Sequence, residues 1–145
     1  MTIYFDTGIL LKLYSAEADS AKAIALVQRF GSPICFTDLQ DAEVRNALYR
    51  KNARNEISRQ ELRKALRDLQ SDIDQAILQP PSIEWPEVFA EAKRLTSKYA
   101  FSTQCRTLDT LHVATALSLG VGSIGSTDER QRVLARKAGL KVVSF

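Results

Sequence analysis

Short apolar runs alternate along this sequence with amphipathic stretches, and the two kinds of segment predict different elements. The apolar runs are too short for helices and predict buried strands at residues 3–5, 33–36, 123–125 and 140–145. The amphipathic stretches repeat apolar residues every three or four positions, as the buried side of a helix requires. They predict helices at residues 9–14, 21–30, 37 to about 52, 57–77 (one or two helices), 86 to about 99, 107–119 and 128 to about 138. This alternation favours an α/β fold with a parallel sheet covered by helices on both faces.

Local signals mark several of the helix ends. Thr37 with Gln40, and Ser58 with Glu61, have the spacing of a capping box, in which each side chain bonds the other residue's backbone N–H. Thr107 is predicted to cap the helix that it precedes. Glycines, which suit the residue just beyond a helix, follow three of the predicted helices: Gly31, Gly120 and Gly139.

Proline and apolar spacing define the helix predicted from residue 86 to about residue 99. Pro86 suits its first position, where a backbone N–H is not needed. The side chains expected to point inward from this helix are those of Val88, Phe89, Ala92 and Leu95.

Bulk properties place the chain among globular proteins with one domain. Its 145 residues can bury a substantial core, and a hydrophobic fraction of 45% with 26% charged residues is typical of soluble proteins. No apolar run is long enough to cross a membrane, and the N-terminus lacks the pattern of a signal peptide, so we expect a cytoplasmic protein. We predict a single domain over residues 1–145, with a helical insertion at about residues 55–80.

Four acidic residues occupy places where an α/β fold gathers its ligands. Asp6 directly follows the first predicted strand, and Asp128 follows the strand at 123–125 and begins a helix. Asp109 lies in the first turn of its helix, and Glu43 lies in the second turn of the helix after the second strand. Because ligands bind beyond the carboxyl ends of the strands in open α/β sheets, we expect these side chains to converge there.

Each acid alone has an ordinary structural explanation. Asp6 and Asp128 suit turn or N-cap positions, Asp109 suits a helix N-terminus, and Glu43 can pair with a nearby arginine. Together, however, neighbouring carboxylates repel one another and raise one another's pKa values. A hard divalent cation relieves this repulsion, because Mg²⁺ and Mn²⁺ prefer oxygen ligands and retain several waters.

The segments around these acids resemble the sequence motifs of PIN-domain proteins. Residues 4–14 (YFDTGILLKLY) resemble the opening motif of that family, and residues 41–48 (DAEVRNAL) resemble its second. Residues 106–116 (RTLDTLHVATA) are similar to the third motif, and residues 126–131 (STDERQ) to the last. The motifs follow in the family's order. Within the family, the chain looks most like the VapC-type toxin ribonucleases of bacterial and archaeal toxin–antitoxin pairs.

This resemblance implies a three-layer α/β/α PIN-like fold and Mg²⁺- or Mn²⁺-dependent cleavage of RNA phosphodiester bonds. Asp6, Glu43, Asp109 and Asp128 take the places of the family's catalytic acidic quartet. Asp6 and Asp109 are then expected to be the main metal ligands, with Asp128 close by. Glu43 is expected to hold a water or to help bind a second ion.

One position departs from the family pattern. The family usually has Ser or Thr two residues after the first Asp, and this chain has Gly8 there. The hydroxyl that supports a water at the site is therefore missing, unless Thr7 or Thr127 substitutes for it. His112, the single histidine, is expected to be a packed or hydrogen-bonded helix residue and not a catalyst.

Positive charge is concentrated in one part of the chain. Between residues 45 and 67 there are eight Lys and Arg residues against two Glu, a net charge of +6. Charge alone favours a solvated helix face, but a nuclease needs positive charge near its acids to bind RNA. The residues expected to contact RNA are Arg45, Arg59, Arg63, Lys64 and Arg106.

The resemblance also implies protein partners: a homodimer, and a small antitoxin that silences the enzyme. The apolar residues after Asn52 offer a docking surface for it or simply form core. Two other functions stay open. One is a catalytically inactive PIN-like module that binds RNA or protein. The other is a haloacid-dehalogenase-like phosphohydrolase, although Gly8 replaces the second Asp of the D-x-D motif that such enzymes use.

Overall fold

The computed structural model describes residues 2–145, which form two compact units. The first unit joins the N-terminal residues up to Asp6 with Pro81–Ser144, and the second comprises Thr7–Pro80 with Phe145. The chain therefore leaves the first unit after its first strand and returns to it near Pro81. Each unit contains its own parallel strands and helices.

A three-stranded parallel sheet forms the centre of the first unit. Its strands are β1 (Ile3–Phe5), β4 (Ser123–Gly125) and β5 (Lys141–Val143), in the order β1-β4-β5. In the register, Phe5 lies opposite Gly125, which in turn lies opposite Val143. The carboxyl ends of the three strands therefore lie at one edge of the sheet.

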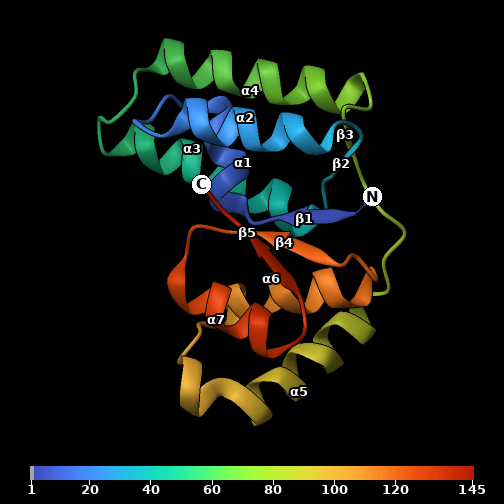
Figure 1. The fold of residues 1–145 in the computed structure, drawn as a ribbon. Coiled ribbons are helices and arrows are strands. Elements are labelled where there is room, and N and C mark those ends of the chain that lie inside the picture. The colour runs from blue at the N-terminus through green and yellow to red at the C-terminus, as the bar shows by residue number, and fades with distance from the viewer. Residues whose placement is uncertain (1) are drawn as a thin grey trace. The chain divides into compact units, whose positions relative to one another are not determined.

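Three helices accompany this sheet in the first unit, and Figure 1 shows them together below the strands. They are α5 (Trp85–Thr103), α6 (Thr107–Ser118) and α7 (Glu129–Lys137), and each packs on the other two. Apolar side chains from the strands and helices, such as Ile124, Leu95 and Leu134, are almost completely buried. This core is the rigid support for the residues that follow β1 and β4.

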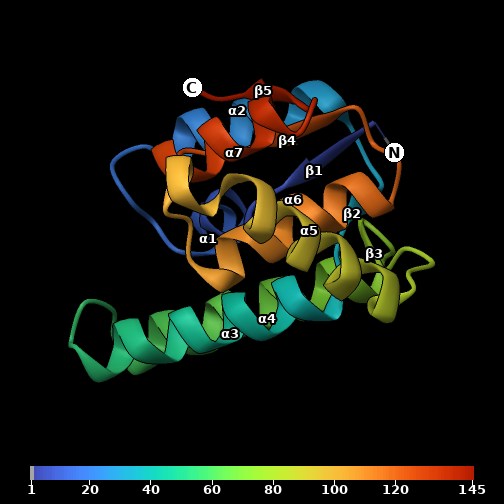
Figure 2. The ribbon, with the colours of Figure 1, turned by 90° about the horizontal axis from the view of Figure 1, so that it is seen from below.

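Helices dominate the second unit. It contains α1 (Thr7–Tyr14), α2 (Ser20–Phe30), α3 (Asp38–Ala53) and α4 (Arg59–Asp74). A short parallel pair joins β2 (Ile34–Cys35) to β3 (Leu78–Gln79). Helices α3 and α4 run side by side as a hairpin, which Figure 2 shows in teal and green.

Most predicted elements are present, with small shifts at their ends, but β3 was not predicted. Residues 57–77 were expected to be helical and Pro80 to break the chain, whereas Leu78 and Gln79 form a strand. Two residues are too few to show the alternation that marks a strand. The segment from about 55 to 80 forms α4 and β3, and the prediction of a single domain with an insertion there stays a prediction.

Two details of the predicted helices are wrong. Phe89 was expected to point inward, but 47% of its surface is exposed, because the buried side of α5 follows Val88, Ala92 and Leu95 and Phe89 lies off that line. Thr107 was expected to cap α6, but the N-cap is Arg106, whose backbone is extended and whose side chain forms no capping bond. Thr107 is already helical and cannot take the N-cap conformation.

The apolar residues of α4 are part of the core. Leu62, Ala65 and Leu69 are buried, as the core interpretation of this segment requires, and the docking interpretation stays a prediction. Large exposed apolar side chains include Phe89 and Phe101 on α5, Leu108 on α6, Ile24 on α2 and Tyr49 on α3. Within residues 2–145, no helix has the length and apolar character needed to cross a membrane.

Both predicted capping boxes are formed, and their different burial leads to a test. Thr37 is buried and bonds the N–H of Gln40, whereas the Ser58–Glu61 box is exposed to solvent. We expect Thr37→Ala to lower the free energy of unfolding by about 1–2 kcal/mol, because water cannot replace a buried partner. Ser58→Ala should cost about 0.5–1 kcal/mol. Urea unfolding of both variants checks the order, and a larger loss for Ser58→Ala would contradict it.

Candidate functional site

Asp6 stands at the point where β1 ends. Its backbone N–H donates to the carbonyl oxygen of Gly125 at 2.8 Å, which continues the β1–β4 ladder by one residue. The side chain is held by this regular backbone, and 16% of it is exposed. Asp6 thus has the position predicted for it, at the carboxyl end of the first strand.

Asp128 follows β4 and caps α7. Its Oδ1 accepts a hydrogen bond from the backbone N–H of Gln131 at 2.8 Å, and its own N–H donates to Ser126 Oγ at 3.1 Å. The capping explanation of Asp128 therefore describes its contacts correctly. Capping leaves the carboxylate half-buried and negatively charged at a helix N-terminus, where negative charge is stabilised.

Asp109 lies in the first turn of α6, and 18% of its side chain is exposed. Its Oδ2 accepts from Arg106 Nε at 3.2 Å. The Arg106 side chain is 81% exposed, so water screens this ion pair and makes it weak. Arg106 was expected to contact RNA, and its side chain pairs with Asp109 in the structure.

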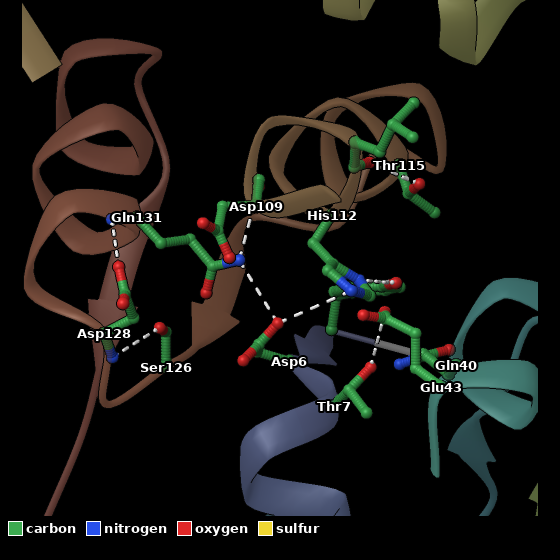
Figure 3. Close-up of polar contacts among 12 residues, drawn as sticks. Asp6, Thr7, Gln40, Glu43, Asp109, His112, Thr115, Ser126, Asp128 and Gln131 are labelled. Carbon is green, nitrogen blue, oxygen red and sulfur yellow. Dashed lines mark hydrogen bonds and ion pairs between the residues drawn. The ribbon is translucent and has the colours of Figure 1, made fainter. Parts of the chain in front are cut away.

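Gln131, on α7, contacts all three of these acids (Figure 3). Its side-chain Nε2 donates to Asp6 Oδ1 at 3.2 Å and to the backbone oxygen of Asp109 at 3.3 Å. Its backbone N–H donates to Asp128 Oδ1. The side chain is completely buried. One residue therefore links three segments of the first unit, each of which carries one predicted acid.

The amide of Gln131 has only one orientation that fits its surroundings. Nε2 faces two acceptors, so exchanging it with Oε1 would set an oxygen against two oxygens. In the observed orientation Oε1 is buried and has no hydrogen-bond donor among residues 2–145. A buried acceptor without a donor costs about 1–3 kcal/mol. The observed orientation therefore forms both hydrogen bonds of Nε2 and leaves Oε1 without one.

His112 lies beside Asp6 and is buried, as Figure 3 shows. Its Nδ1 is 2.7 Å from the hydroxyl of Tyr4, and its Nε2 is 3.6 Å from Asp6 Oδ1. When Tyr4 donates to Nδ1, the imidazole proton is on Nε2 and faces the carboxylate. The expectation that His112 is a packed, hydrogen-bonded helix residue is confirmed, and its ring adds a polar neighbour for Asp6.

Glu43 belongs to the second unit. It lies half-buried on α3, and its Oε1 accepts from Thr7 Oγ1 at 3.0 Å. Thr7 was considered as a replacement for the hydroxyl that Gly8 lacks, and its hydroxyl contacts this fourth acid. The structure thus joins Asp6, Asp109 and Asp128 through Gln131 in one unit, and joins Glu43 to Thr7 in the other.

The basic residues predicted to contact RNA have two kinds of surroundings in the second unit. Arg45 pairs with Asp41 at 2.7 Å, and Lys64 pairs with Asp68 at 2.5 Å. Arg59 and Arg63 are exposed on α4 and form no salt bridge within residues 2–145. Arg59 and Arg63 therefore keep their charge available to a polyanion.

Comparison with known proteins identifies the family. The sequence model of the PIN domain matches residues 3–137, which is most of the chain. The chain belongs to the PIN-domain family.

The solved structures agree about the fold. The structure of FitAcB from Neisseria gonorrhoeae superimposes with a TM-score of 0.65, covering 97% of this chain and 95% of that one at 15% sequence identity. The predicted PIN-like α/β/α fold class is confirmed. No curated protein matches the sequence. PIN domains are generally nucleases, which places this one among hydrolases that act on nucleic acids.

The first unit of this PIN domain offers donors that suit a hard divalent cation. Across residues 2–145, no group of three or more His, Cys, Asp or Glu side chains is arranged so that it could hold a metal ion. Mg²⁺ does not need such a cage, because it usually binds through one or two carboxylates and retains several waters. Asp6 and Asp109 carry the carboxylates, and Gln131 Oε1 adds a buried acceptor that lacks a donor. The chemistry of these donors fits Mg²⁺ or Mn²⁺.

Gln131 is the residue of this site to which the sequence interpretation gave no role. The buried positions of α7 are Gln131, Leu134 and Ala135, so an amide occupies a core position on that helix. Buried polar groups require hydrogen-bond partners. A glutamine in an apolar stripe, three residues after a predicted acid, was the signal that could have identified it.

The N-cap role of Asp128 can be separated from its charge. Asparagine caps helices as well as aspartate does, so Asp128→Asn should leave the free energy of unfolding within about 0.5 kcal/mol of wild type, whereas Asp128→Ala should lose about 1 kcal/mol. Thermal and urea unfolding of both variants provide the measurement. Equal losses for the two variants would show that the charge, and not the capping hydrogen bond, stabilises α7.

Proposed function

We propose that this PIN domain is a Mg²⁺- or Mn²⁺-dependent endoribonuclease that acts as the toxin of a toxin–antitoxin pair. The observation that carries the proposal is the linkage of Asp6, Asp109 and Asp128 through one buried residue. Stability alone would favour an apolar side chain at this buried position, and not an amide that links three acid-bearing segments. Family membership supports the nuclease part of the proposal.

Each residue of the site has a proposed task. Asp6 and Asp109 would bind the metal ion, and Asp128, the N-cap of α7, would hold water near it. A divalent ion acidifies water near neutral pH and stabilises negative charge on the departing oxygen. Glu43 positions water or helps to bind a second ion. This role is supported by its hydrogen bond to Thr7, the residue that directly follows Asp6 in the chain.

Binding of RNA requires positive charge in addition to the acids. The carboxylates repel phosphates, so affinity must come from basic side chains such as Arg59, Arg63 and Lys64 on α4, with Arg45 and Arg106. Single-stranded or looped RNA is the proposed substrate, because its backbone and bases are accessible to side chains. The exposure of Arg59 and Arg63 supports this role.

The wider setting of the enzyme follows from its resemblance to VapC-type toxins. We propose a cytoplasmic homodimer whose activity a small antitoxin blocks. The haloacid-dehalogenase alternative is set aside, because the chain belongs to the PIN-domain family. A catalytically inactive RNA- or protein-binding PIN module remains the second candidate, and Gly8 is the observation that favours it.

Replacement of single acids tests the enzymatic proposal. Asp6→Asn and Asp109→Asn should each lower the rate of RNA cleavage by more than about 100-fold. Residues that only hydrogen-bond to a metal ligand typically cost about 10- to 100-fold when replaced, and a ligand itself should cost more. Glu43→Gln should also lower it. The measurement is cleavage of a labelled single-stranded RNA with Mn²⁺ or Mg²⁺. EDTA should stop the reaction and added Mn²⁺ should restore it.

Each variant needs its thermal unfolding measured beside wild type, so that loss of activity is not confused with loss of folding. A folded Asp6→Asn variant that still cuts RNA would show that the metal-site assignment is wrong. A wild-type protein that binds RNA but never cuts it, with or without Mn²⁺, would favour the inactive module.

The basic residues of α4 can be tested by the salt dependence of RNA binding. Replacing Arg59, Arg63 and Lys64 together by Ala should weaken binding and reduce the slope of log affinity against log salt by about 2, since each phosphate contact contributes about 0.7. The control replaces three exposed lysines of the first unit, Lys93, Lys98 and Lys141, and removes the same charge. Fluorescence anisotropy in EDTA measures binding without cleavage. Equal slopes for the two triple variants would assign α4 to a solvated face.

A further inference from the structure

Gln131 is a buried polar residue of the first unit to which the proposed catalysis assigns no task. We propose that Gln131 is a positioning residue that fixes the Asp6 carboxylate, relative to Asp109 and Asp128, for binding of the divalent ion. The inference rests on the proposed function, because it concerns the same acidic site. It adds to the site an uncharged amide that takes no part in the reaction itself.

The contacts of Gln131 distinguish positioning from simple packing. Both hydrogens of Nε2 are used, one toward Asp6 Oδ1 and one toward the backbone oxygen of Asp109. Asp6 follows β1 and Asp109 lies on α6, so the amide fixes the distance between two elements of the fold. The backbone N–H of the same residue holds Asp128 at the start of α7.

Only an amide of this length satisfies those contacts. A glutamate here would set a third oxygen-bearing group against Asp6 Oδ1 and the Asp109 carbonyl, and an apolar side chain would leave both acceptors without this donor. Hydrogen bonds to a metal-binding carboxylate set its orientation, and loss of such a partner typically weakens metal binding. Oε1 is buried without a donor within residues 2–145, which costs free energy. The two hydrogen bonds of Nε2 must therefore stabilise the fold enough to offset that cost.

Oε1 also lies at the acidic site in Figure 3, where Gln131 extends between Asp109, Asp128 and Asp6. A buried acceptor in that position is suited to receive a hydrogen bond from a water. Gln131 therefore presents donors to the protein's own acceptors, and its buried Oε1 has no donor among residues 2–145. An amide combines both properties, whereas lysine or arginine would only donate.

The test compares Mn²⁺ binding to the full-length wild-type protein and two variants by isothermal titration calorimetry. Gln131→Met keeps the size of the side chain and the backbone bond to Asp128 but removes the amide, and Gln131→Asn keeps the amide on a shorter stem. We expect both to raise the Kd for Mn²⁺ by about 10- to 100-fold while the variants stay folded. If Gln131→Met does not fold, Gln131→Asn decides the question.

Leu134→Val is the matched control, because Leu134 is buried on the same helix but is apolar. It should lower the unfolding temperature and leave the Kd for Mn²⁺ unchanged. If Gln131→Met or Gln131→Asn is folded and binds Mn²⁺ as wild type does, the positioning role is refuted and the nuclease proposal stands. If Leu134→Val weakens Mn²⁺ binding equally, the effect reflects helix stability and the role is likewise refuted. If wild type binds no Mn²⁺, the proposed function fails, and the role of Gln131 fails with it.

Discussion

The linkage of three acid-bearing segments through one buried amide is the interaction on which the site of the first unit depends. Asp6, Asp109 and Asp128 come from three different segments, and nothing in their own chemistry would keep three carboxylates near one another. Gln131 connects the three segments, because it donates to the carboxylates of Asp6 and Asp128 and to the backbone oxygen of Asp109. A neutral donor holds the acids without cancelling their charge, whereas an arginine or lysine in its place would neutralise the site.

The surrounding fold makes this arrangement rigid. Asp6 is fixed by the extended ladder between β1 and β4, and Asp128 is fixed as the N-cap of α7. His112 and Tyr4 form a buried polar pair beside Asp6. Precise sites depend on side chains whose positions are set by regular elements and by supporting hydrogen bonds. Strand end, helix cap and buried amide together provide such support in this PIN domain.

The sequence predicted what depends on local pattern and missed what depends on contacts between distant segments. Both capping boxes and the position of Asp6 after β1 follow from residues that are neighbours in the chain. Strand β3 was missed because two residues carry no period, and Phe89 was misplaced because an apolar residue beside a helical stripe looks like part of it. The contact between Gln131 and Asp6 joins residues 125 positions apart, and no spacing rule anticipates it.

A crystal structure of the protein soaked in Mn²⁺, with the metal located by its anomalous scattering, tests most directly whether these acids are held for a cation. The expected result is an anomalous peak within coordination distance of the Asp6 and Asp109 carboxylates, with Gln131 still donating to Asp6 Oδ1. A map with no peak at this site under saturating Mn²⁺, and with Asp109 still paired to Arg106, would contradict it.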